Sequence, residues 1–172
     1  MSVPYELETE RTFLRKLTIA DAKNFYQLNI DPEVLKYTGD KPFDSIEVAK
    51  SFLAGYDQYS RYGVGRLAVI EKSTGQFIGW CGLKYSPGTD EFDIGFRFYK
   101  SYWNRGFATE TARICIQHGL HNLQLQEIIG RARKDNTASI RVLEKLGMKF
   151  KGNFDFDGHE GVLYSITKST GK

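Results

Sequence analysis

The chain has 172 residues, of which 41% are hydrophobic, 14% aromatic and 26% charged, and its formal net charge is +3. This length is typical of one domain that buries enough apolar surface to fold without a disulfide or a structural metal. The weak positive charge does not indicate a nucleic-acid-binding protein, and no stretch approaches the 18 apolar residues of a membrane-spanning helix. The opening MSVPYELETE carries no signal region. We therefore expect a single cytoplasmic domain over residues 1–172, with neither nucleic acid nor a membrane as partner.

The first half of the chain predicts strands separated by short helices. The expected strands are residues 11–17, 66–72 and 76–85. The expected helices are residues 19–29, a short one restarting at Asp31-Pro32, and one from Asp44 or Ser45 to about Tyr59. Thr18 can cap the first helix, and Ser73-Thr74-Gly75 favours a hairpin between the last two strands.

The second half predicts an alternation of strands and helices. The expected strands are residues 91–99, 127–133, 148–155 and 161–167, and the expected helices are residues 105–121 and 136–146. In the first of these strands Phe92, Ile94, Phe96 and Phe98 face one way, and Asp93, Gly95, Arg97 and Tyr99 the other. The pattern predicts an α/β fold with a mixed, mostly antiparallel sheet of seven strands and flanking helices.

The cysteines and histidines do not form a recognisable site. Cys81 and Cys115 lie in apolar surroundings, and their spacing fits neither a metal site nor a disulfide framework. His118, His121 and His159 are scattered and form no triad or metal set. We therefore expect no metal, buried cysteines, and histidines that are structural or exposed.

Residues 98–110, FYKSYWNRGFATE, predict a helix start that binds an anion. Gly106 opens the helix after a strand and a polar turn, so unpaired N–H groups and the positive end of the helix dipole are presented there. Ala108 keeps the first turn thin, and Lys100, Arg105 and the Thr109 hydroxyl can contact a phosphate. A plain surface helix start is the alternative, because the segment matches neither the P-loop nor the dinucleotide-binding fingerprint.

Residues 134–147, KDNTASIRVLEKLG, predict a helix with a hydroxyl on its apolar face. Ser139 shares that face with Val142, Leu143 and Leu146. A hydroxyl in this position needs a partner or lines a cavity. Asn136 is well placed to cap the helix, and capping alone is a sufficient role for it.

Together the two segments resemble the GNAT superfamily of acetyl-CoA-dependent acyltransferases. The resemblance covers nearly the whole chain and is closest to the branch of the ribosomal-protein N-terminal acetyltransferases RimJ and RimL. It is carried by LETERTFLRKLTIADA, DPEVLKYTG, FDIGFRFYKSYWNRGFATETA and NTASIRVLEKLGM. It implies a GNAT-type sheet in which the strands at residues 91–99 and 125–133 splay apart, with acetyl-CoA as co-substrate.

The resemblance implies which residues bind acetyl-CoA. Phe98, Tyr99 and Lys100 match the strand end whose backbone pairs with the pantetheine arm, and Asn136 matches an Asn that contacts this arm. The pyrophosphate loop is matched by Asn104, Arg105, Gly106, Phe107, Ala108 and Thr109. Two positions depart from the family pattern. Trp103 replaces the usual Gln or Arg, and Asn104 replaces a glycine, which is expected to weaken one phosphate contact.

The resemblance also implies a direct attack of a neutral amine on the thioester, with strand-end N–H groups stabilising the oxyanion. Ser139 matches the Ser proposed to protonate the departing thiolate, because the family's alternative Tyr falls near Leu143. Asp93 and Glu160 match acidic positions and are the candidates for the base that takes a proton from the amine. Alternatively, water relays this proton and both carboxylates are ordinary surface charges.

We therefore expect an N-acetyltransferase that acts on a primary amine, either a peptide or protein N-terminus or a small molecule, as a monomer or homodimer. A non-catalytic acyl-CoA-binding or sensing domain is the alternative, and Ser139 argues against it. The acceptor is expected to bind between residues 29–38, 45–62 and 153–160. The aromatic residues of this region suit an apolar acceptor cleft or the core equally well; they are Tyr37, Phe43, Tyr56 and Tyr59.

Overall fold

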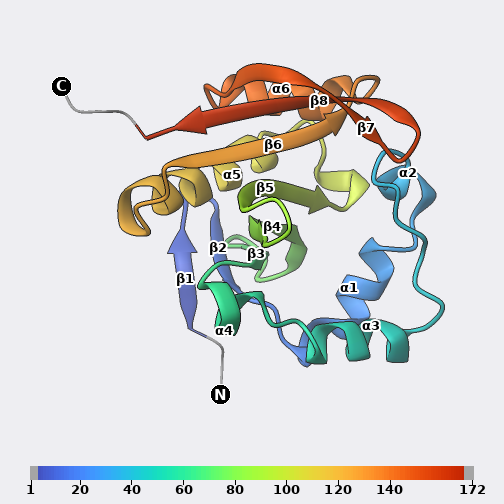
Figure 1. Cartoon of the computed structure of the whole chain (residues 1–172). Helices are drawn as coiled ribbons and strands as arrows, with labels where there is room; N and C mark the ends of the chain where they lie inside the picture. Colours follow the sequence, from blue (N-terminus) through green and yellow to red (C-terminus); the bar gives the residue numbers. More distant parts are fainter. Residues whose placement is uncertain (1–3, 169–172) are drawn as a thin grey trace.

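The computed structural model describes residues 4–168, so the first three and last four residues of the expected domain lie outside the described residues. The described residues form one sheet in the order β1-β2-β3-β4-β5-β6-β8-β7, with helices on both faces (Figure 1). The strands are β1 Tyr5–Glu8, β2 Thr12–Lys16, β3 Arg66–Glu71, β4 Phe77–Ser86, β5 Glu91–Phe98, β6 Glu127–Arg133, β7 Lys149–Phe156 and β8 His159–Thr167. The α-helices are α1 Ala22–Leu28, α2 Pro32–Leu35, α3 Ile46–Ala54, α4 Gln58–Tyr62, α5 Phe107–Gln117 and α6 Thr137–Lys145. Shorter helical turns are η1 Ile19–Asp21, η2 Lys100–Tyr102 and η3 His118–Asn122.

The expected mixed and mostly antiparallel sheet is confirmed, but it has eight strands and not seven. The additional strand is β1, which pairs antiparallel with β2 at one edge of the sheet. Its residues are nearly all exposed, so the segment shows no buried apolar alternation from which a strand can be predicted. The strand forms through backbone pairing with β2. This pairing places β1, and the turn that joins β1 to β2, against α5.

Two predicted helices differ from the observed ones. The helix expected to run to about Tyr59 is divided into α3 and α4, because Gly55 ends α3. The helix expected over residues 105–121 begins at Phe107 and continues as a π turn from His118. The later start leaves Arg105 and Gly106 in the loop before α5.

The two faces of the sheet bury different sets of side chains. On one face Ile94 and Phe98 of β5 pack with Cys115 of α5, and all three are at most 5% exposed. On the other face Trp80 of β4 packs with residues of α1 and α3. The predicted alternation along β5 and the predicted burial of both cysteines are therefore confirmed; Cys81 and Cys115 are free thiols.

The pair β5 and β6 lies at the centre of the sheet and is its parallel pair. These strands are in register only at Asp93 and Ile129, whereas β5 pairs with β4 along its whole length. This confirms the predicted splay. Because parallel strands end at the same edge of a sheet, the ends of β5 and β6 lie at one edge, on either side of the gap between the strands. The chain continues from β5 through a loop into α5, and from β6 into α6. The candidate site lies at this edge.

Candidate active site

The loop before α5 presents its backbone to solvent. Asn104 and Gly106 both have left-handed backbone conformations, with φ of 60° and 83°, and Gly106 caps α5. A Cβ placed on Gly106 would meet only a guanidinium nitrogen of Arg11, at 3.3 Å. The first amide that finds an acceptor within the helix is that of Glu110, which donates to the Gly106 carbonyl at 3.0 Å. The amides before it are therefore available to an anion, and a pyrophosphate group fits this arrangement.

The backbone at the end of β5 is more engaged than the sequence predicts. The indole Nε1 of Trp103 donates to the Phe98 carbonyl at 2.9 Å, and the Tyr99 amide donates to the Ile78 carbonyl at 3.1 Å. The Lys100 carbonyl accepts from the Trp103 amide at 3.1 Å. The family resemblance implies that the backbone of residues 98–100 pairs with the pantetheine arm, but these three groups already have partners within the chain. The available groups lie on the β6-facing edge of β5, beyond its register position at Asp93.

Arg11 stands beside this loop, although sequence reasoning did not single it out. Its guanidinium lies 4.0 Å above the Phe107 ring, and its Nε is 2.8 Å from a carboxylate oxygen of Glu110. The Glu110 carboxylate also accepts from the Thr9 hydroxyl at 2.6 Å and from the Arg11 amide at 3.1 Å. Although burial opposes it, hydrogen bonds from Thr9 and Arg11 hold the pKa of Glu110 below its ordinary value. These contacts orient Arg11 so that its terminal nitrogens lie next to Gly106.

The other predicted side chains of the loop differ in their exposure. Arg105 is half exposed and lies over the rings of Tyr102 and Phe107, at 5.1 and 5.3 Å. Phe107 is 2% exposed, so its side chain anchors the helix and only its backbone can face a ligand. Lys100 is exposed, and Ala108 and Thr109 are half-buried.

Asn136 and Ser139 meet at the start of α6. The side-chain oxygen Oδ1 of Asn136 accepts from the Ser139 amide at 3.3 Å, so the predicted helix cap is confirmed. The Asn136 Nδ2 donates to the Ser139 hydroxyl at 2.9 Å. Because the Ser139 oxygen accepts this bond, its own proton can be donated elsewhere.

The two candidate bases lie in different surroundings. Asp93 is 17% exposed, and its two oxygens lie 3.1 Å from Arg66 and 4.0 Å from Arg131. Each oxygen faces an arginine, which favours Asp93 as a structural charge. Glu160 is 79% exposed, lies 3.6 Å from Lys134, and stands beyond the end of β6. Asp93 is level with the middle of β6, so the structure does not bring the two carboxylates together.

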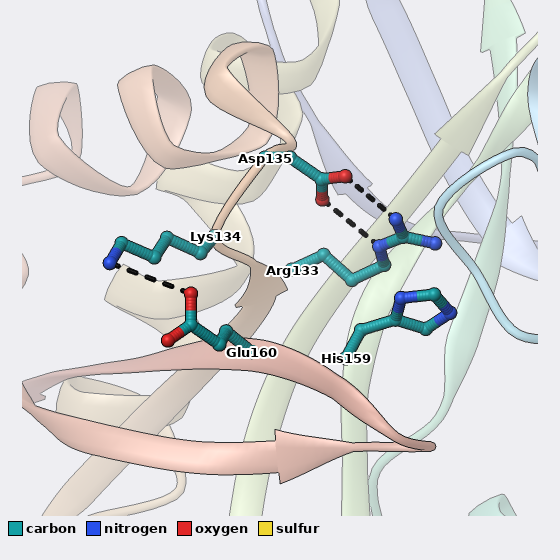
Figure 2. Close-up of a pocket in the computed structure, with 5 residues that line it drawn as sticks. All are labelled: Arg133, Lys134, Asp135, His159 and Glu160. Carbon is teal, nitrogen blue, oxygen red and sulfur yellow. Dashed lines mark hydrogen bonds and ion pairs between the residues drawn. The ribbon is translucent and has the colours of Figure 1, made fainter.

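Two adjoining cavities open where β6 ends. One encloses about 240 Å³ and is lined by Arg133, Lys134, Asp135, His159 and Glu160. Figure 2 shows Arg133 bound to Asp135 and Lys134 bound to Glu160, with His159 beside Arg133. The other encloses about 400 Å³ and is lined by Leu35, Lys36, Gly39, Asp40, Arg133, Phe156, Asp157 and His159. Arg133 and His159 line both cavities, so the two form one continuous groove.

The groove lies between two of the three segments expected to bind the acceptor. Residues 35–40 form one wall and the hairpin of β7 and β8 forms the other, whereas no described residue of 45–62 lines either cavity. Of the four aromatic residues expected to line the acceptor site, the ring of Tyr37 lies 5.3 Å from the guanidinium of Arg133 at the groove, and the other three have structural roles. Phe43 packs on Phe25, and the hydroxyls of Tyr56 and Tyr59 hydrogen-bond to the backbone of Arg66 and Leu17.

Comparison with known proteins identifies the family. Residues 11–149 match the family described as acetyltransferase (GNAT) domain. The chain belongs to the GNAT acetyltransferase family. It is 31% identical over 163 residues to the uncharacterized N-acetyltransferase p20 of Bacillus licheniformis, and the match covers 93% of this chain and 92% of that protein.

Solved structures of GNAT acetyltransferases have the same fold. The acetyltransferase (GNAT family) from Bacillus anthracis superposes with a TM-score of 0.81 at 26% identity, covering 94% of this chain and 98% of that chain. Mycobacterium smegmatis RimJ, solved in complex with CoA-disulfide, superposes with a TM-score of 0.78 at 21% identity, covering 91% and 81%. The eight-stranded sheet with its splayed central pair is therefore a GNAT fold.

In residues 4–168, no three His, Cys, Asp or Glu side chains come together as a metal site. Among the same residues, none of the helices has both the length and the apolar character that a membrane crossing requires.

We expect the Arg11→Met variant of this GNAT acetyltransferase to bind acetyl-CoA about ten- to a hundredfold more weakly, because a hydrogen bond to a charged group is lost. Methionine keeps the apolar contact with Phe107 and removes only the guanidinium. Isothermal titration measures the affinity. Arg113→Met is the matched control, because Arg113 is an arginine of α5 itself that donates instead to the Lys145 carbonyl, at 3.0 Å. An unchanged affinity of Arg11→Met for acetyl-CoA would show that Arg11 does not contact the ligand and serves only as the ion-pair partner of Glu110.

Proposed function

We propose that the chain is one acetyltransferase domain that transfers the acetyl group of acetyl-CoA to a primary amine. The observation that carries this proposal is the parallel pair β5 and β6, which is in register at one position. The carboxyl end of each of these strands is followed by the start of a helix. One helix start has the open glycine, Gly106, and the other has the capped hydroxyl, Ser139. In this proposal the pyrophosphate lies at Gly106 and the pantetheine arm enters the gap between the strands.

The chemistry follows from what faces this gap. The amine nitrogen attacks the thioester carbon, and the carbon–sulfur bond breaks. The sulfur takes a proton from the Ser139 hydroxyl, and the Ser139 oxygen takes a proton in turn from water. Backbone N–H groups on the open edge of β5 stabilise the charge that develops on the carbonyl oxygen. The amine loses its proton to water that reaches the groove or to Glu160, which is the more exposed of the two candidate carboxylates.

We propose that the acceptor enters through the groove at Arg133 and His159, on the side of the sheet opposite α5. Both side chains are polar, and the groove has acidic and basic residues on both walls. A polar amine suits this lining better than an apolar one. The similarity to RimJ supports a peptide N-terminus as one acceptor, and an aminosugar, a polyamine or an amino-bearing antibiotic suits the same lining.

A screen tests the proposed function. The purified chain is incubated with acetyl-CoA and one amine at a time, and release of the CoA thiol is measured. The probes are spermidine, glucosamine, kanamycin and a pentapeptide with a free N-terminus. We expect amine-dependent thiol release with at least one probe, above the hydrolysis seen without amine. Binding of acetyl-CoA with no amine-dependent release would support the sensing domain instead, and absence of both would refute the proposal.

A further inference from the structure

Arg97 connects the end of β5 to the wall of the groove. Its side chain is 13% exposed, although it carries a charge, and its guanidinium lies 5.3 Å from the Trp80 ring. One terminal nitrogen donates to the side-chain oxygen Oδ1 of Asn29, and the other donates to a carboxylate oxygen of Asp40 at 2.8 Å. Asn29 is itself 4% exposed and donates to the Phe25 carbonyl at 2.7 Å. The guanidinium is therefore held at a fixed place by a buried network.

Asp40 has the opposite character. It is 59% exposed and lines the larger cavity next to Gly39 and Lys36. One of its oxygens is bound by Arg97, while its second oxygen accepts no hydrogen bond within residues 4–168. A carboxylate that is oriented through one oxygen can use the other to accept a hydrogen bond from a bound amine.

Gly39, the neighbour of Asp40, lies close to the other wall of the groove. A Cβ on Gly39 would lie 2.7 Å from a carboxylate oxygen of Asp157 and 3.7 Å from the Phe156 ring. The backbone at Gly39 therefore lies against the tip of the hairpin between β7 and β8, and Asp40 lies beside it in the lining of the groove. An amine that enters the groove can reach the open oxygen of Asp40.

We propose that Asp40 contacts the acceptor amine and that Arg97 is the residue that positions Asp40. This inference rests on the proposed function, because it assigns the residue that binds the second substrate. An amine is mostly an ammonium ion at neutral pH, so it arrives as a cation that a half-exposed carboxylate attracts. Arg97 holds the carboxylate at the sheet and prevents it from turning into solvent.

The experiment compares five single variants, and the double variant Asp40→Asn with Arg97→Met, with the parent chain. Asp40→Asn removes the charge at nearly constant shape, Asp40→Glu retains it, and Arg97→Met removes the positioning guanidinium. Asp57→Asn and Arg61→Met are the matched controls, because they make the same changes in a surface pair separated by 3.3 Å, whose carboxylate is 54% exposed. The probe is the amine that the parent chain acetylates fastest.

Two kinds of measurement are made on each variant. Steady-state kinetics give kcat, the KM of the amine and the KM of acetyl-CoA. A binding titration gives the dissociation constant of the same amine in the presence of CoA, which has no acetyl group to transfer. We expect Asp40→Asn and Arg97→Met to weaken amine binding about ten- to a hundredfold in both measurements. The KM of acetyl-CoA should change less than about twofold, since neither residue lies at the loop before α5.

The pattern among the variants decides the roles. Asp40→Glu should recover part of the affinity, and the double variant Asp40→Asn with Arg97→Met should bind little worse than either single variant, because both act on one contact. Unchanged amine binding in Asp40→Asn would overturn the inference. An equal loss of amine and acetyl-CoA binding in Arg97→Met would also overturn it, since that result assigns Arg97 to the fold alone. A parent chain that acetylates no amine would instead show that the proposed function has failed.

Discussion

The Gly106→Asp variant is expected to lose binding of acetyl-CoA while it remains folded. Gly106 has a φ of 83°, which aspartate tolerates better than most residues, so we expect a cost of only about 1 kcal/mol in stability. The new carboxylate would stand where the pyrophosphate is expected and repel it. It would also lie within reach of Arg11, whose nitrogen is 3.3 Å from the position of the Cβ, and so compete for that guanidinium.

Thermal unfolding with and without acetyl-CoA measures the loss. A ligand present at a hundred times its dissociation constant stabilises the native state by about 2.7 kcal/mol, which raises the Tm of a chain of this size by roughly 5–10 °C. We expect this shift in the parent and no shift in Gly106→Asp. Gly63→Asp is the control, because Gly63 also has a left-handed backbone, with a φ of 71°, and lies in a different turn. A variant at Gly106 that shifts as much as the parent would show that this loop is not the phosphate site.

The Ser139→Ala variant is expected to lower kcat by roughly ten- to a thousandfold, which brackets the contribution of a positioned general acid. The affinity for acetyl-CoA should hardly change, because proton transfer to the sulfur occurs only in the transition state. Helix α6 should also persist. The Asn136 cap bonds to the backbone amide of residue 139, which alanine retains, and alanine favours a helix.

Steady-state kinetics and acetyl-CoA titration together test this assignment. Thr137→Ala is the matched control, because it removes another hydroxyl from the same turn of α6 at an exposed position. The control should keep the kcat of the parent. A Ser139→Ala variant that turns over normally would mean that the thiolate leaves without this proton, and that Ser139 serves only to complete the hydrogen bonds of Asn136.

Features that depend on neighbouring residues could be predicted from the sequence. The period of two along residues 91–98 predicts which side chains of β5 face α5, because successive side chains of a strand point to opposite faces. Gly106 predicts the turn before α5, since the backbone there is left-handed. Asn136 predicts the cap of α6, because its side chain reaches the amide three residues later.

The contacts that complete the candidate site join residues far apart in the chain. Arg11 reaches the loop before α5 because β1 and β2 lie against that helix, and β1 has no apolar alternation of its own. Asp93 meets Arg131 because β6 flanks β5, and it meets Arg66 because β3 lies just beyond β4 in the sheet. No local pattern specifies that order of strands.

The sequence by itself thus determined the class of fold, the helix start at Gly106 and the capping of α6 by Asn136, because each depends on periodicity or on contacts within one turn. Only the tertiary structure decided that the Trp103 indole donates to the Phe98 carbonyl at the end of β5 and that Asp93 forms ion pairs with two arginines. It also decided that Asp40 accepts a hydrogen bond from Arg97 at the wall of the groove. The physical reason is that these partners meet only after the strands have paired, and hydrogen bonds and ion pairs depend on that final geometry and not on separation along the chain.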